Sequence, residues 1–118
     1  PTLDDVLSHP VAGSSWEGFV LETLLAAAPP EAAASFYRTA AGAEVDLVLE
    51  LGGRHGRWAI EIKRSASPSV SRGLHNAIHD LKPSSTFIVH AGQDAFPLTD
   101  SVEAIGLRAL ADLLLMAR

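Results

Sequence analysis

The chain has 118 residues, of which 47% are hydrophobic and 19% are charged, and it contains no cysteine. This length suits one domain with a real core, and the apolar content excludes an intrinsically disordered chain. The lack of cysteine excludes a disulfide scaffold and a thiolate zinc site, and it fits the cytoplasm, where we expect the protein. No apolar run approaches the ~20 residues that span a bilayer, so we expect no membrane partner.

The formal net charge is −5, from 9 Lys and Arg and 14 Asp and Glu. Nucleic-acid affinity comes from Lys and Arg, so an acidic chain does not bind phosphate through its overall charge. The charge is uneven, because residues 1–62 hold 3 basic and 9 acidic residues while residues 63–82 hold 4 and 1. We therefore expect this domain alone to bind nucleic acid weakly, although a phosphate-bearing substrate is not excluded.

The first elements are a lead-in and a helix. Residues 1–14 read as an irregular lead-in segment, and residues 15–118 read as a single domain. Ser14 or Ser15 can cap a helix over 16–28, whose apolar residues recur at helical spacing and which a Pro-Pro pair ends.

The middle of the chain predicts a β-hairpin. After a short strand candidate at 35–38, two runs alternate with period two at 44–51 and 57–63, and a glycine-rich connection joins them. The apolar residues of the two strands lie on the same face of the sheet only if the residue numbers of each directly opposite pair add to an odd number. A four-residue connection pairs Val45 with Ile62, Leu47 with Ile60 and Leu49 with Trp58 on the core face, and Glu44 with Lys63, Asp46 with Glu61, Val48 with Ala59 and Glu50 with Arg57 on the other.

The second half alternates helices and strands. The expected order is a helix at 70–81, a buried strand at 86–90, a loop at 94–100, an edge strand at 104–107 and a final helix at 108–116. Together with the hairpin, this order predicts an α/β fold in which helices flank a small mixed β-sheet.

Three charged side chains gather on one face of the expected hairpin. A six-residue connection would set Asp46 against Lys63, but both registers keep Asp46, Glu61 and Lys63 together. They could be solvated positions of an ordinary outer face. However, two carboxylates placed opposite each other destabilise a sheet. A Mg²⁺ ion, which prefers carboxylate oxygens, water and phosphate, would relieve that repulsion, and a nearby lysine would stabilise charge on a phosphate.

These residues resemble a known signature. Asp46 followed by Glu61-Ile62-Lys63, after a helix that carries Glu17, is similar to the motif of the PD-(D/E)XK nuclease superfamily, with Val45 where the superfamily name implies a proline. Five spaced blocks also resemble the C-terminal domain of a prokaryotic family of AAA-type ATPases, long catalogued as a domain of unknown function. The blocks are His9-Pro10, Ser15-Trp16-Glu17-Gly18-Phe19, Tyr37-Arg38-Thr39, Gly42-Ala43-Glu44-Val45-Asp46 and Glu61-Ile62-Lys63-Arg64-Ser65.

The resemblance implies a restriction-endonuclease-like fold with an α-β-β-β-α-β core, and a metal-dependent phosphodiester hydrolysis on DNA or another nucleic acid. Carried over to this sequence, Asp46 and Glu61 would ligate Mg²⁺ or Mn²⁺ with help from the Ile62 carbonyl. Lys63 would be the catalytic lysine, and Glu17 would complete the catalytic set from the first helix.

The resemblance also implies a longer parent protein. In that family a P-loop ATPase module precedes the nuclease-like domain, so we expect this chain to be the C-terminal piece and the ATPase module to be its partner. The alternative is a catalytically inactive nuclease fold that serves docking, oligomerisation or nucleic-acid tethering of the ATPase. A homo-oligomer is left open.

Other polar residues are weaker candidates. Glu44 shares the charged face and is a lesser site candidate, while Arg38 is either a cover for the end of the sheet or a phosphate contact. Glu22 lies off the face of Glu17 and is expected in solvent. His75 and His79 have a zinc-compatible spacing of four residues, but no third ligand accompanies them and we expect an exposed pair.

Overall fold

The computed structural model describes residues 15–65 and 67–118; the expected lead-in at 1–14 and the His9-Pro10 block lie outside the described residues. The described elements are α2 (Trp16–Ala27), β1 (Ala33–Arg38), β2 (Glu44–Gly52), β3 (Gly56–Ile62), α3 (Arg72–Leu81), β4 (Ser85–His90), β5 (Phe96–Pro97), β6 (Val102–Gly106) and α4 (Leu107–Met116). The α/β class is confirmed. None of the described helices is long and apolar enough to cross a lipid bilayer.

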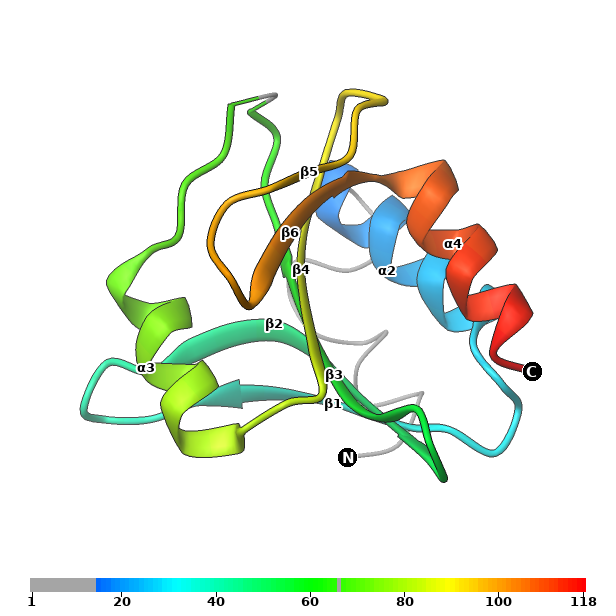
Figure 1. The fold of residues 1–118 in the computed structure, drawn as a ribbon, viewed down its shortest axis with the longest axis horizontal. Coiled ribbons are helices and arrows are strands. Elements are labelled where there is room, and N and C mark those ends of the chain that lie inside the picture. The colour runs from blue at the N-terminus through cyan, green and yellow to red at the C-terminus, as the bar shows by residue number, and fades with distance from the viewer. Residues whose placement is uncertain (1–14, 66) are drawn as a thin grey trace.

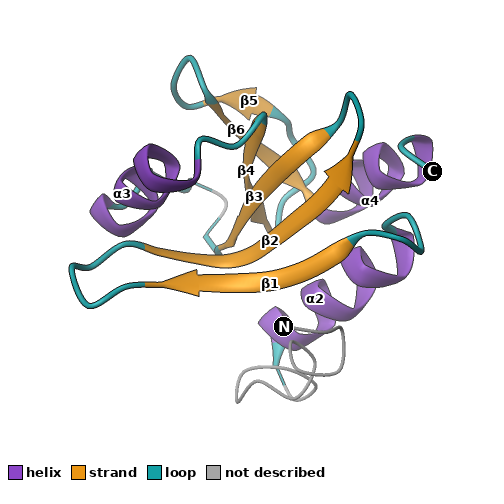
Figure 2. Cartoon of the chain, turned by 90° about the horizontal axis from the view of Figure 1, so that it is seen from below, coloured by secondary structure: helices purple, strands orange, loops and turns teal. Residues whose placement is uncertain are grey.

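The strands form one mixed sheet of six strands in the order β1-β2-β3-β4-β6-β5. The pairs β1/β2, β2/β3 and β5/β6 are antiparallel, whereas β3/β4 and β4/β6 are parallel. Helix α3 covers one face of the sheet, and α2 and α4 lie side by side on the other (Figures 1 and 2). This arrangement confirms the expected mixed sheet flanked by helices.

The edge of the sheet differs from the prediction. The segment expected as a loop at 94–100 contains β5 (Phe96–Pro97), which forms the outer edge, and β6 (Val102–Gly106) lies inside the sheet between β4 and β5. A two-residue strand is too short to show a period in the sequence. Strand β6 is buried on both faces, as an interior parallel strand should be.

The core is divided between the two faces of the sheet. One apolar cluster joins α2 and α4 to the sheet through residues such as Leu24, Leu47, Ile60 and Leu110. The other joins α3 to the opposite face and is smaller; it contains Ala43, Val45, Val48, Ala59, Leu74, Ala77, Ile88 and Val102.

The central register of the hairpin is confirmed. Leu47 is opposite Ile60, Leu49 is opposite Trp58 and Glu50 is opposite Arg57, as the four-residue connection predicts. Near the turn, a register shift between Glu50 and Gly52 brings Gly52 opposite Gly56, so three residues rather than four connect the strands. Gly52 and Gly56 have φ values of 73° and 62°, a conformation that glycine adopts without steric cost.

The far end of β2 departs from regular alternation. Ser35 of β1 is opposite Val48, but Tyr37 is opposite Val45, so β2 holds one extra residue between these pairs. Such a β-bulge reverses which face the preceding residues occupy. Val45 therefore belongs to the cluster under α3 rather than to the cluster of Leu47, and the expected core face from Val45 to Leu51 is wrong at its first residue.

Candidate functional site

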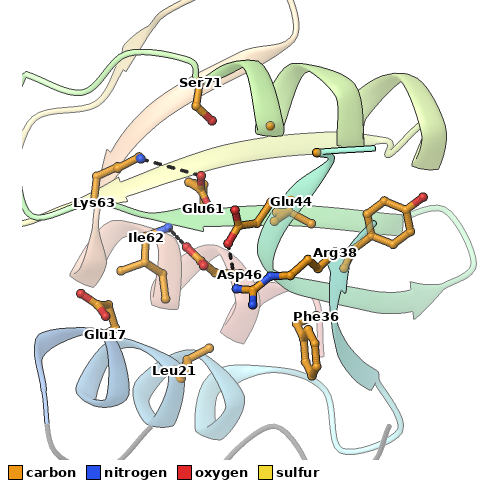
Figure 3. A pocket seen from close by; sticks show the side chains of 14 residues that line it. Glu17, Leu21, Phe36, Arg38, Glu44, Asp46, Glu61, Ile62, Lys63 and Ser71 are labelled. Carbon is orange, nitrogen blue, oxygen red and sulfur yellow. Dashed lines mark hydrogen bonds and ion pairs between the residues drawn. The ribbon is translucent and has the colours of Figure 1, made fainter. Parts of the chain in front are cut away.

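A cavity of about 460 Å³ opens at the end of β3, between the first turns of α2 and α3 and the bulged end of β2 (Figure 3). All four predicted catalytic residues and Ile62 line this cavity. The full lining is Glu17 and Leu21 of α2, Phe36, Tyr37 and Arg38 of β1, Gly42, Glu44, Val45 and Asp46 at the start of β2, Glu61, Ile62 and Lys63 at the end of β3, and Ser71 and Gly73 at the start of α3.

Asp46 lies at the bulge of β2, and its side chain, rather than the backbone of β2, pairs with the backbone of β3 at this point. Its carboxylate accepts a hydrogen bond of 2.8 Å from the backbone N–H of Ile62. In an extended strand the N–H and C=O of one residue point to the same side. The Ile62 carbonyl therefore lies on the side of β3 that faces Asp46.

Glu61 is a buried acid in direct contact with Asp46. The residue is 7% exposed. Burial is the main cause that raises the pKa of the Glu61 carboxyl to about 9, followed by a hydrogen bond and charge repulsion from Asp46, while the Lys63 ammonium acts in the opposite direction. The Glu61 carboxyl therefore stays neutral to a higher pH than an ordinary glutamate does.

Lys63 follows β3 and reaches back over Glu61. Its backbone N–H donates a hydrogen bond of 2.9 Å to the Val89 carbonyl of β4, which fixes the start of the side chain. Its Nζ lies 3.9 Å from Oε2 of Glu61 (Figure 3). The prediction that Asp46, Glu61 and Lys63 gather on one side is confirmed as a matter of position.

The expected pairing of Glu44 with Lys63 is wrong. Glu44 instead accepts a hydrogen bond of 2.8 Å from Nη2 of Arg38 across the β1/β2 pair. The reason is the bulge of β2, which ends the regular β2/β3 ladder at Leu47 and Ile60 and leaves Glu44 opposite Arg38. Glu44 and Lys63 nevertheless both line the cavity.

Glu17 lies in the first turn of α2, which Ser15 caps through a hydrogen bond of 3.2 Å from the Gly18 N–H to its hydroxyl oxygen. The Glu17 side chain borders the cavity from the α2 side, below Ile62 in Figure 3. Within residues 15–65 and 67–118, no group of three or more acidic, histidine or cysteine side chains is close enough together to hold a metal ion. Glu17 thus shares the cavity with the Asp46–Glu61 pair without joining it.

Several cavity residues were missed or undervalued by the sequence reasoning. Phe36, which lies in the short strand expected at 35–38, is 41% exposed and lines the cavity, although the sequence analysis assigned it no role. Ser71 caps α3 through a hydrogen bond of 3.1 Å from the Leu74 N–H, and this cap starts the helix at Arg72, two residues later than expected. A serine before a helical pattern is a recognisable capping signal that indicates this start.

Tyr37 faces away from Phe36 and toward α3. Its hydroxyl donates a hydrogen bond of 3.0 Å to Asp80, and this bond is the main reason that the pKa of Tyr37 is raised. His75 and His79 are both exposed on α3, as expected, and neither lines the cavity.

Comparison with known proteins identifies a family without a known role. The model of the family described as "Domain of unknown function (DUF4143)" matches residues 12–110. Uncharacterized proteins of Mycobacterium bovis and Mycobacterium tuberculosis are each 43% identical to the chain over 106 residues, which cover 87% of this chain but 23% of theirs. The chain therefore spans only about a quarter of the length of these curated relatives. No solved structure matches it.

Proposed function

The chain belongs to the family described as a domain of unknown function (DUF4143), and we propose that its cavity is the active site of a metal-dependent phosphodiesterase acting on nucleic acid. The observation that carries the proposal is the contact between the buried Glu61 carboxyl and Asp46, with Lys63 3.9 Å from Glu61. Two acids in contact cannot both ionise unless a positive charge lies between them. A cation held between the two acids would allow both to ionise, and this supports the proposal of a metal site.

The order of elements supports a nuclease fold. Elements α2, β1, β2, β3, α3 and β4 follow one another in the α-β-β-β-α-β order that the PD-(D/E)XK resemblance implies. Asp46 lies on the second of these strands, and Glu61 and Lys63 lie at the end of the third. We propose on this basis that the domain has the restriction-endonuclease-like core.

The donor set fits Mg²⁺ or Mn²⁺. These ions take hard oxygen ligands, and Mg²⁺ is commonly bound by one or two carboxylates, with water and substrate phosphate completing its coordination. Asp46 and Glu61 would supply the carboxylates and Ile62 its carbonyl. When bound, such an ion polarises the phosphate and lowers the pKa of a bound water.

The remaining residues would act on the substrate. The Lys63 ammonium, anchored at its backbone and exposed enough to meet a phosphate, would stabilise the charge that develops on the phosphate oxygens. The Ile62 N–H keeps the Asp46 carboxylate in one orientation. Glu17, on the opposite side of the cavity, would orient water next to the scissile phosphate.

A second candidate is a nuclease fold without catalysis, which docks or tethers an ATPase module of the parent protein. The observation that favours it is that no third acidic, histidine or cysteine side chain in the described part of the chain joins Asp46 and Glu61. The length of the relatives leaves room for such a module.

Cleavage of supercoiled plasmid in the presence of Mn²⁺ tests the first candidate against the second. We expect the intact protein to nick the plasmid, Asp46→Asn and Glu61→Gln to abolish nicking, and Lys63→Met to slow it by roughly 100- to 1000-fold. Glu22→Gln is the matched control, because Glu22 is an exposed acid of α2 that does not line the cavity. If Glu61→Gln nicks as fast as the parent, the cavity is not the source of the activity and the second candidate is favoured.

A further inference from the structure

A stretch of positive charge follows β3 in an otherwise acidic chain. Residues 63–82 hold 4 basic and 1 acidic residue, whereas the whole chain has a net charge of −5. Helix α3 lies within this stretch and begins at the wall of the cavity, since Ser71 and Gly73 both line it. The proposed chemistry uses Lys63 and leaves the other basic residues of the stretch without a role.

We propose that the outer face of α3, formed by Arg72, His75 and His79, binds the phosphate backbone of the nucleic acid that enters the cavity. Affinity for nucleic acid comes mainly from cationic side chains that contact phosphates, and such contacts fix where the substrate lies. The inference rests on the proposed function and adds to it the surface that guides the substrate.

The three side chains form one row along α3. They are three and four residues apart, a spacing that places side chains above one another on one face of a helix. All three are exposed, whereas Leu74 and Ala77 are buried against the sheet. Figure 2 shows α3 at the outside of the molecule. From Arg72 to His79 the row extends about 10.5 Å along the helix, roughly three phosphate spacings along the axis of a duplex.

The Arg72 guanidinium is available for a ligand. The recorded ion pairs of arginine are those of Arg38, Arg57 and Arg108. Within the part of the chain that the structure describes, no ion pair involves Arg72. A planar guanidinium with five N–H donors matches the oxygens of a phosphate, so Arg72 suits this ligand best among the side chains of the row.

The two histidines make the charge of the row depend on pH. Histidine is the side chain whose charge changes between about pH 5 and pH 8. Arg72 supplies the positive charge of the row in alkaline solution, and His75 and His79 add to it as the solution becomes mildly acidic. Lys82, which is exposed directly after α3, adds a cation at the far end of the helix.

The other charged groups around α3 have partners of their own. Asp80, the acid of α3, accepts a hydrogen bond of 3.0 Å from the Tyr37 hydroxyl of β1. Glu44 of β2 forms an ion pair with Arg38, and Arg57 of β3 forms one within its own hairpin. The positive charge of the row is therefore not neutralised by an acid of its own helix.

Charge density favours nucleic acid over an acidic peptide as the ligand. A duplex carries one negative charge per about 1.7 Å of its axis. Even a fully extended acidic peptide carries at most one charge per about 3.3 Å. A row of cations that runs straight along a helix thus meets more negative charge on a duplex, and its position at the cavity wall suits the substrate of the proposed reaction.

Fluorescence anisotropy with a labelled DNA duplex of about 20 base pairs tests this surface. The buffer contains EDTA, so that the probe is not cut. We expect Arg72→Gln to weaken binding by roughly 5- to 15-fold at about 50 mM salt and to lower the slope of log K against log salt by about 0.9, the value for one phosphate contact. Arg72→Lys should keep most of the affinity, since an ammonium also binds phosphate. The matched control is Arg108→Gln, which removes the same charge from α4 on the opposite face of the sheet.

The pH dependence of binding tests the histidines. We expect the unaltered chain to bind the duplex at least about 10-fold more tightly at about pH 5.5 than at about pH 7.5. The double variant His75→Gln, His79→Gln should lose most of this difference. Because both histidines are exposed, its urea denaturation midpoint at pH values near 7.5 should match that of the unaltered chain.

Equal effects of Arg72→Gln and Arg108→Gln, or an unchanged pH dependence in the double variant, would overturn the assignment. Binding of polyglutamate as tightly as the duplex, at equal concentration of charge, would also overturn it and favour an acidic protein partner. These results would leave metal-dependent nicking by Asp46 and Glu61 untouched. A plasmid that stays intact in Mn²⁺, together with the expected binding by α3, would contradict only the proposed chemistry and support the surface.

Discussion

At the scale of single residues, the proposed function depends most on Glu61. A carboxyl in an ordinary setting has a pKa of 4.5, and burial beside Asp46 raises the pKa of Glu61 to about 9. A folded chain gains nothing in stability from forcing two acids together in its interior. We therefore regard the Asp46–Glu61 contact as a functional feature that the rest of the fold tolerates.

This contact predicts the pH dependence of stability without metal. Between about pH 4.5 and about pH 9 the folded chain holds a proton on Glu61 that the unfolded chain has lost, so the free energy of unfolding falls as the pH rises. The stability that the Glu61 proton contributes to the folded chain is fully present below about pH 4.5. It is lost once the pH passes about 9. Its slope is at most about 1.4 kcal/mol per pH unit. Urea denaturation in EDTA across this range measures it.

The variant Glu61→Gln provides the comparison, because its amide can donate to Asp46 but does not titrate. We expect its denaturation midpoint to change less with pH than that of the parent. Glu22→Gln, which alters an exposed acid, should keep the parental dependence. A parental pH dependence in Glu61→Gln would show that the titration of Glu61 is not a determinant of stability.

At the scale of elements, the junction of β6 and α4 depends on one glycine. Gly106 caps α4 and is paired with His90 of β4, and a Cβ added to it would lie 2.6 Å from the Gly92 carbonyl oxygen. A backbone atom cannot move aside as a flexible side chain can. We expect Gly106→Ala to reduce the free energy of unfolding by about 1–3 kcal/mol, measured by urea denaturation. A midpoint equal to that of the parent would contradict this close approach.

The hairpin shows which element-scale features were predictable. The alternation of apolar residues in β2 and β3 was enough to predict the pairing of Leu47 with Ile60 and of Leu49 with Trp58, because a slip by one residue would expose the core. Alternation carries no signal for the bulge between Val45 and Val48, since an extra residue in β2 depends on how β1 packs beside it.

The bulge also explains what could be predicted of the site. Asp46, Glu61 and Lys63 were expected together on one face from their spacing, and all three line the cavity. The partner of Glu44 and the inclusion of Phe36 followed from the local geometry of β1 and β2, which the sequence pattern did not reveal. Residues that face each other across a regular ladder are predictable, and residues at an irregularity are not.

At the scale of the whole molecule, the fold class was predictable and the strand order was not. Alternating helices and strands indicate a mixed sheet, but the insertion of β6 between β4 and β5 depends on parallel pairing over long connections, which leaves no local mark in the sequence. The placement of α2 and α3 on opposite faces is equally a property of the whole. It brings the first turns of both helices to the same cavity.

The uneven charge of the chain is consistent with a low affinity of this domain alone for nucleic acid. The acidic residues Glu17, Asp46 and Glu61 line the cavity, and Lys63 and Arg38 line it as well, while the net charge stays at −5. A bound cation would offset part of the acidic charge next to the substrate phosphate. Under this proposal, the parent protein's other parts supply most of the affinity for nucleic acid.

The most direct test of the account is anomalous diffraction from crystals of the protein soaked in MnCl₂. We predict an anomalous peak in the cavity about 2.1 Å from an Asp46 oxygen and a Glu61 oxygen, with the two carboxyls no longer hydrogen-bonded to each other. Asp46→Asn crystals soaked in the same way should lack the peak. A peak only outside the cavity, or a Mn²⁺-soaked parent with no peak between Asp46 and Glu61, would contradict the account.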